Sequence, residues 1–154
     1  MAIDKILSAS LGSGVGGKIG QVVQSVLTTK VNSTSTSFVD IGLSVAITPS
    51  ATSSTILVMV SQTLNAERDS GEIFGYVNIM RATTEVGEWF FQGSTNRIGH
   101  VSIMYVDSPS TTSATTYKTQ IRASTTSDGG KVRANQQSTS GESPSSIHLI
   151  EIAG

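Results

Sequence analysis

Residues 115–124, TTYKTQIRAS, contain the clearest structural signal in the sequence. Side chains suited to a core alternate along them with polar ones: Tyr117, Thr119, Ile121 and Ala123 against Lys118, Gln120 and Arg122. Successive side chains of a β-strand point to opposite faces of its sheet, so this alternation predicts a strand with one buried and one solvated face. The stretch therefore indicates an antiparallel β-sheet protein.

Strand signals recur on both sides of this stretch. Residues 55–62, TILVMVSQ, form a continuous apolar run of strand length, which is typical of a central strand covered on both faces. The other segments of strand character are residues 19–28, 37–41, 43–48, 73–82, 86–92, 98–106, 131–135 and 146–152. About nine or ten short strands without a long helix predict an all-β fold, an antiparallel β-sandwich of jelly-roll type.

Turn-forming residues separate the expected strands. Gly42 is expected to join two short strands, and Thr83–Glu85 is expected to turn the chain between two paired ones. Asp128-Gly129-Gly130 supplies residues that readily adopt positive φ, which predicts a tight hairpin leading into residues 131–135.

Composition narrows the range of functions. Charged residues are 14% of the chain, against about 25% in an average protein, and the formal net charge is -1. No overall charge therefore attracts the chain to nucleic acid or to an anionic membrane. Cysteine is absent, which excludes disulfides, thiolate nucleophiles and cysteine-ligated zinc, and favours synthesis in a cytoplasm.

Neither a membrane span nor a secretion signal is expected. The longest apolar run, residues 56–60, is far shorter than the roughly 20 residues that a helix needs to cross a bilayer. Residues 1–11 contain only Ile6-Leu7 as an apolar pair, close to Asp4 and Lys5, and so form no apolar signal segment.

The beginning of the chain differs from the rest. Residues 1–17 combine scattered apolar side chains with a glycine-rich hinge at residues 12–17, and a single sandwich domain is expected over residues 18–154. We expect residues 1–17 to act as an arm that docks on a trimer mate or on a particle shell. The apolar side chains available for docking are Ile3, Ile6, Leu7 and Leu11.

Several motifs resemble reactive sites but lack the surroundings that such sites need. Residues 12–17, GSGVGG, match the dinucleotide pattern GxGxxG, yet no strand is expected before them and no helix after them. His100 and His148 have no second metal ligand at a helical or hairpin spacing. No G-x-S-x-G sequence is present to expose a serine nucleophile.

Two groups of acidic residues remain as candidates. Glu67, Asp69 and Glu72 lack the alternation of a calcium loop and predict a solvated loop, with an ion site as the alternative. Glu85 and Glu88 are the only close acid pair on a predicted hairpin, which is the pairing that a glycoside hydrolase would require. We predict no catalytic residue, no cofactor and no metal site, and we expect that the chain is not an enzyme.

The aromatic run Trp89-Phe90-Phe91 places large rings on both faces of one expected strand. Trp89 and Phe91 would share a face, and Phe90 would take the other. One face can enter the core of the domain. The other face would then belong to the same core, to a subunit interface, or to a surface that stacks on sugar rings.

Several segments together resemble a known domain family. They are residues 20–24 (GQVVQ), 34–40 (TSTSFVD), 42–49 (GLSVAITP), 55–58 (TILV), 107–109 (DSP), 115–118 (TTYK) and 150–154 (IEIAG). The set resembles the tail-fibre-like β-sandwich domain of virion surface proteins in marine and freshwater tailed bacteriophages and cyanophages, over residues 18–154. The resemblance implies a trimeric, surface-displayed domain without catalytic residues. Such domains often end longer fibre chains, whereas only a short arm precedes this one.

Two functions follow as expectations. The first is a phage virion structural protein that decorates the particle surface as a homotrimer of the cement or head-fibre type, with its arm docked on other proteins of the capsid or tail. The alternative is a tail-fibre tip that binds a host cell-surface glycan or receptor, with exposed aromatic residues such as Trp89 stacking on sugar rings. Either function places the protein on the virion surface after synthesis in the host cytoplasm, without a nucleic-acid or membrane partner.

Overall fold

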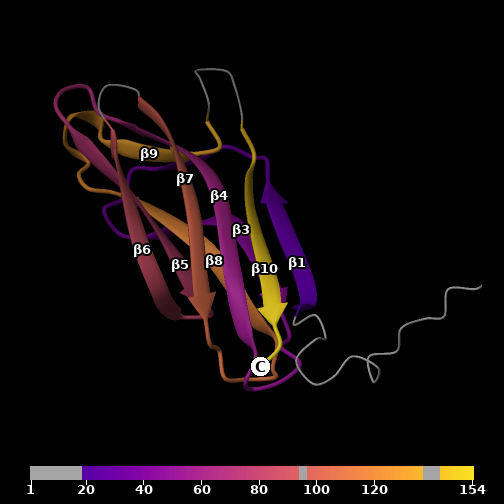
Figure 1. The fold of residues 1–154 in the computed structure, drawn as a ribbon. Coiled ribbons are helices and arrows are strands. Elements are labelled where there is room, and N and C mark those ends of the chain that lie inside the picture. Colours follow the sequence, from indigo (N-terminus) through magenta and orange to yellow (C-terminus); the bar gives the residue numbers. More distant parts are fainter. Residues whose placement is uncertain (1–18, 94–96, 137–142) are drawn as a thin grey trace, which may run out of the picture.

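The computed structural model describes residues 19–93, 97–136 and 143–154, and these form a sandwich of two antiparallel sheets (Figure 1). The predicted all-β fold is therefore confirmed. Among the described residues, no helix is long and apolar enough to cross a membrane.

The described residues form ten strands and a short 3-10 turn at Ser127–Gly129. In chain order they are β1 (Ile19–Leu27), β2 (Val31–Ser33), β3 (Val39–Ile47), β4 (Thr55–Glu67), β5 (Ile73–Arg81), β6 (Thr84–Gly93), β7 (Arg97–Asp107), β8 (Thr115–Ala123), β9 (Lys131–Ala134) and β10 (Ser145–Ile152).

The strand order is that of a jelly roll. In the first sheet, called sheet A, β1, β10, β4 and β7 lie side by side, and the short pair β9 and β2 continues beside the far end of β4. In the second, called sheet B, the order is β3-β8-β5-β6. Without β2 and β9, the strands alternate between the sheets as in two interlocked Greek keys, so the predicted jelly-roll type is also confirmed.

The core lies between the two sheets and follows the alternation in the sequence. The inward residues of β8 are buried, as predicted from residues 115–124, and Tyr117 and Ile121 are fully excluded from water. The Tyr117 hydroxyl donates a hydrogen bond of 2.6 Å to Asp107, which also pairs with Arg81 at 2.9 Å. Burial, together with the bond to Asp107, raises the pKa of Tyr117 and keeps its phenol neutral.

Two strand boundaries differ from the expectation. Residues 37–48 were expected to form two strands around Gly42, but β3 runs through this glycine with a bulge between Asp40 and Ser44. Gly42 has φ +88, a conformation that favours glycine, so it bends the strand without ending it. The predicted pair around residues 83–85 is confirmed, because β5 and β6 are neighbours and Ala82 and Thr83 turn the chain.

The predicted hairpin at Asp128-Gly129-Gly130 is wrong. Asp128 and Gly129 do adopt positive φ, but the turn carries the chain from β8 in sheet B to β9 in sheet A. It is held by Arg68, which pairs with Asp128 at 2.9 Å, and by a backbone bond from Asp69 to Asp128. The turn residues determine only the local bend of the chain. The partners of β9 are β2 and β4, which the turn sequence does not specify.

The buried alternation yields a direct test in β3, where adjacent residues face opposite ways. Leu43 is fully buried and Ser44 is exposed. We expect Leu43→Ala to lower the free energy of unfolding by about 2–5 kcal/mol, because it leaves a cavity between the sheets. Ser44→Ala should change it by less than about 0.5 kcal/mol. Chemical denaturation measures both, and equal effects would contradict the described register.

Candidate functional site

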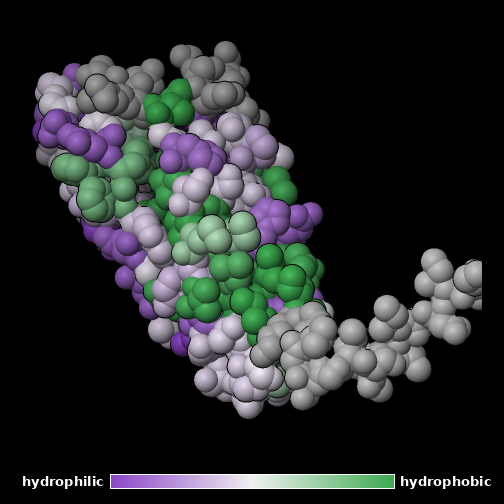
Figure 2. All heavy atoms as spheres, in the orientation of Figure 1, coloured by the Kyte–Doolittle hydropathy of each residue, from purple (hydrophilic) through white to green (hydrophobic). Residues whose placement is uncertain are grey.

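The outer face of sheet A carries apolar side chains across all four of its main strands (Figure 2). Register places Val22, Ile150, Leu57 and Val106 in one row across β1, β10, β4 and β7. In the next row, Met59 and Met104 lie opposite each other. Met104 is 70% exposed, Val22 58% and Val106 56%. We call these six residues the apolar face.

A shallow groove runs through the apolar face. It has a volume of about 250 Å³ and is lined by Met59, Met104, Ser61, Ser102 and His148, with the backbone of the same strands as its floor. Methionine side chains are flexible and polarisable, so a surface that contains them adapts to the shape of a partner. The groove is open, and the two methionines give it apolar walls.

Charged side chains are missing from this part of sheet A. Residues 19–27, 55–63 and 98–106 contain no Asp, Glu, Lys or Arg, and the single acid of β10, Glu151, points inward and is 1% exposed. The expectation that residues 55–62 are covered on both faces is therefore met only on the inner side. Leu57 and Met59 remain half-buried on the outer side.

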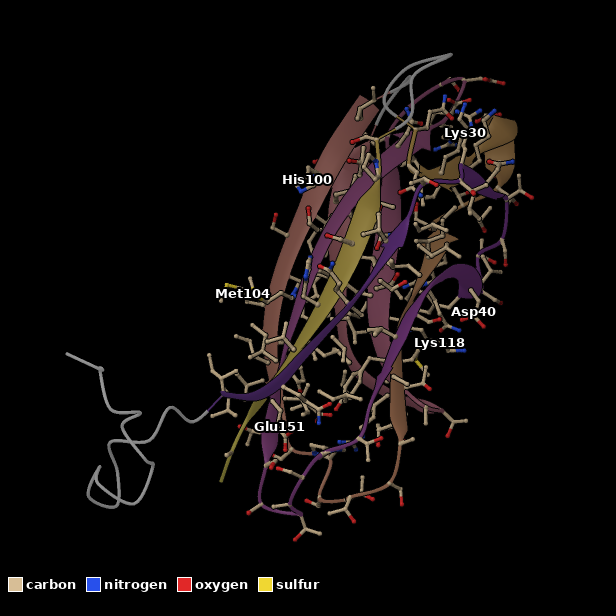
Figure 3. The ribbon with its side chains drawn as sticks, turned by 90° about the vertical axis from the view of Figure 1, so that its right-hand side faces the viewer. Lys30, Asp40, His100, Met104, Lys118 and Glu151 are labelled. Carbon is tan, nitrogen blue, oxygen red and sulfur yellow. The ribbon has the colours of Figure 1, made fainter. Side chains whose placement is uncertain are left out.

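The outer face of sheet B has the opposite character. Figure 3 places Asp40 and Lys118 on the side of the sandwich opposite Met104. Lys118 pairs with Asp40 at 2.9 Å and Gln120 donates to its other oxygen at 2.9 Å. The bond from Lys118 is the main cause that holds the pKa of Asp40 below its usual value. Sheet B therefore presents a polar, hydrated surface.

An aromatic cluster extends this polar surface along β5 and β6. The Arg122 guanidinium lies 3.7 Å from the ring centre of Tyr76 and 5.0 Å from that of Phe38, and Glu88 pairs with it at 3.2 Å. Phe90 is 68% exposed and its ring centre lies 6.2 Å from that of Tyr76. Phe90 is the ring in this cluster that is open to a ligand.

The predicted division of Trp89, Phe90 and Phe91 between two faces is confirmed. Trp89 and Phe91 pack against the core, and Trp89 meets Tyr105 edge-on at 6.3 Å. Both rings are packed against the core of the sandwich, so Trp89 is not the exposed ring that stacking on a glycan would require. Phe90 takes that position instead, and its role as an interface or stacking residue stays a prediction.

The acidic and histidine candidates are occupied by structural contacts. Glu85 accepts a bond from Asn78 at 2.8 Å, and Glu88 holds Arg122. His100 and His148 both lie on the outer side of sheet A, where His100 contacts Ser61 at 3.0 Å. In the part of the chain that the structure describes, no three His, Asp or Glu residues are grouped as metal ligands.

Of the three acids Glu67, Asp69 and Glu72, Glu67 is held in ion pairs with Lys131 and Arg133. Burial tends to raise the pKa of Glu67, but the hydrogen bonds and charges of Arg133 and Lys131 outweigh this and lower it. Glu67 is thus satisfied by cations from its own sheet. Arg68 pairs instead with Asp128 across the turn after β8.

The predicted docking residues, Ile3, Ile6, Leu7 and Leu11, lie outside the described residues. The described part of β1 begins at Ile19, which is 65% exposed and pairs with Ile152 at the end of β10. Val22 of the apolar face follows three residues later, so the start of β1 lies beside this face.

The buried carboxylate of Glu151 holds the start of β1, and the sequence analysis missed this residue. Glu151 accepts hydrogen bonds from the backbone and hydroxyl of Ser50, both at 2.6 Å, and from Gln21 at 2.8 Å. These bonds, led by that from the Ser50 hydroxyl, lower the pKa of Glu151 to about 2. A Cβ on Gly20 would lie 2.9 Å from the carboxylate, so β1 passes it closely. The sequence did contain an indication of this contact, because Glu151 is the single acidic residue of β10 and occupies an inward-facing position.

Comparisons with known proteins reveal limited similarity. No protein-family profile matches the chain, and no curated protein sequence matches it. The VP2 subviral particle of infectious bursal disease virus is 10% identical with a TM-score of 0.39, over 87% of this chain and 38% of that one. A structure of the Gt strain of this virus is 13% identical with a TM-score of 0.37, over 88% and 39%. The chain spans about two fifths of their length, and similarity at this level does not establish a shared function.

The Glu151 contacts predict a specific response to acid. A carboxyl whose pKa falls from its ordinary 4.5 to about 2 on folding stabilises the fold fully above pH 4.5. That stability is lost as the pH falls from about 4.5 to about 2. We expect Glu151→Gln to be less stable at pH 7 and to lose less stability over this window.

Denaturation at a series of pH values measures this effect. Gln21→Ala removes one of the donors to Glu151 and should give an intermediate response. An unchanged acid transition in Glu151→Gln would show that the carboxylate does not stabilise the entry of β1.

Proposed function

We propose that this protein is a non-enzymatic structural component of a virus particle, a homotrimer of the cement or head-fibre type that decorates the surface of a tailed phage. The observation that carries the proposal is the apolar face of sheet A, which is uncharged and lies beside the start of β1. Apolar area costs about 25 cal/mol per Å² when it is left in water. A continuous face of this kind is expected to be covered in the working state.

The difference between the two outer faces supports a fixed orientation on the particle. Sheet A would pack against the assembly, and the charged and hydroxyl-bearing side chains of sheet B would face water. The chain has few charges, which suits copies crowded on a surface because it limits repulsion between them. The two solved structures of viral origin agree with this proposal, but the tailed-phage assignment depends on the sequence resemblance.

The contacts of the candidate acids support a role without catalysis. A glycoside hydrolase needs two carboxyls free to meet the sugar on either side of its scissile bond. Glu85 and Glu88 are instead engaged with Asn78 and Arg122 on the outer face of sheet B.

The proposal predicts assembly in solution and on particles. Light scattering should give three times the 16.0 kDa mass of the chain at micromolar concentration.

Antibody labelling of intact particles should place the protein on heads. A truncated chain without residues 1–11 should keep the circular dichroism of the sandwich and lose incorporation into particles. A stable monomer that is absent from particles would overturn the proposal.

A second function, a fibre tip that binds a host glycan, is favoured by the cluster around Phe90. An exposed ring next to Arg122, Glu88 and Gln92 combines a stacking surface with hydrogen-bonding groups, as sugar-binding sites do. The site would lie on sheet B and would leave the apolar face free for assembly.

Replacement of Phe90 tests this second function. If the tip binds glycans, Phe90→Ala should lower retention on a glycan array or on host cells by tenfold or more, since stacking area is lost. Thr116→Ala, an exposed change elsewhere on sheet B, is the matched control. Equal retention of both variants, or no retention of the unaltered protein, would exclude a glycan site at Phe90.

A further inference from the structure

We propose that the apolar face of sheet A is covered by the arm of a neighbouring copy, with Ile3, Leu7 and Leu11 packed on it. This inference depends on the proposed function, because it names the partner of the assembly surface. It commits to an arm exchanged between subunits. Docking of the arm on its own domain or on the particle shell, and face-to-face packing of two copies, are alternatives that the experiment separates.

The dimensions of the face suit a single extended segment. The apolar face and its groove run from Leu57 to Ser61 along β4, about 17 Å, and the four strands together are about 19 Å wide. This footprint of about 320 Å² is less than the roughly 800 Å² that each partner buries in a stable interface. Flat packing of two such faces would therefore give a small contact. An arm on the face, added to contacts between the domain bodies, gives a larger one.

The sequence of the arm matches the face in character, and the arm is long enough to cross it. Residues 3–11 span about 30 Å when extended, against about 17 Å for the face and its groove along β4. In an extended arm, Ile3, Leu7 and Leu11 share one side, and they would face a surface whose exposed members are Val22, Met104 and Val106. The groove between Met59 and Met104 offers adaptable walls for a leucine or isoleucine side chain.

The spacer between arm and domain favours a neighbouring copy. A chain that turns back on its own sheet needs only about two to five residues. Here residues 12–18 separate Leu11 from β1 and can reach about 24 Å when extended. The start of β1 at Ile19 lies beside the apolar face of the same copy, so such a reach exceeds what docking on that copy requires. It gives the arm enough length to leave its own domain.

Symmetry is consistent with this arrangement. The arm and the face are two different surfaces, so a contact between them on separate copies is head-to-tail, and it closes as a ring when the rotation between copies allows it. Three copies in a ring give the homotrimer of the proposed function. Face-to-face packing would instead pair one surface with itself and give a dimer.

Cross-linking between single-cysteine variants tests the exchange directly, because the chain has no cysteine of its own. A Leu7→Cys chain is mixed and reassembled with a size-tagged Met104→Cys chain and treated with a flexible bis-maleimide. We expect a product that contains one tagged and one untagged chain. Leu7→Cys mixed with tagged Phe90→Cys, which places an exposed thiol on sheet B, is the matched control and should give little of it.

Two further measurements keep the test decisive. A Leu7→Cys, Met104→Cys double variant that is cross-linked only within single chains would overturn the exchange. Met104→Asp should leave the isolated fold intact, because Met104 is 70% exposed, and should raise the concentration needed for trimers by tenfold or more.

The outcomes separate this inference from the function on which it depends. A trimer that forms without the mixed product and tolerates Met104→Asp would refute arm exchange and leave the structural role standing. A dimer insensitive to removal of residues 1–11 would indicate face-to-face packing and would also refute it. A monomer that never joins particles would refute the proposed function itself.

Discussion

The pairing of β4 is the constraint on which sheet A depends. β4 bonds to β7 along one edge from Ile56 to Ala66, and along the other edge to β10 and then to β9. Its inner side chains, Ile56, Val58 and Val60, anchor the core against sheet B. Its outer side chains include Leu57 and Met59, so the same strand supplies the centre of the core and the centre of the exposed apolar face.

The two sheets differ in how their outer faces meet water. On sheet B, long charged side chains lie across aromatic rings, as Arg122 does over Tyr76, and cover apolar area while their charged groups stay hydrated. In sheet A, residues 19–27, 55–63 and 98–106 contain no lysine or arginine, and Met104 and Val106 are left exposed. A fold that can cover one face with arginine and lysine, and leaves the other bare, is suited to one-sided assembly.

Glu151 links the core to the start of β1. Its carboxylate lies between the sheets and is satisfied by Ser50 from the loop between β3 and β4 and by Gln21 from β1. A buried carboxylate is tolerated only when such donors surround it. β1 is an edge strand of its sheet, so these bonds help to hold it in place beside β10.

The sequence by itself determined the strands, the sandwich and the inward side of each strand, because side-chain alternation follows directly from strand geometry, as in residues 115–124. It also separated Phe90 from Trp89 and Phe91. Only the tertiary structure decided which strands are neighbours. It placed β9, the strand after the turn at Asp128, in sheet A, and it showed that β3 continues through Gly42. It alone revealed that Leu57, Met104 and Ile150 form one face, and that Glu151 meets Gln21. These residues are far apart in the chain, and a period of two assigns each to a side of its strand but says nothing of what lies beside it.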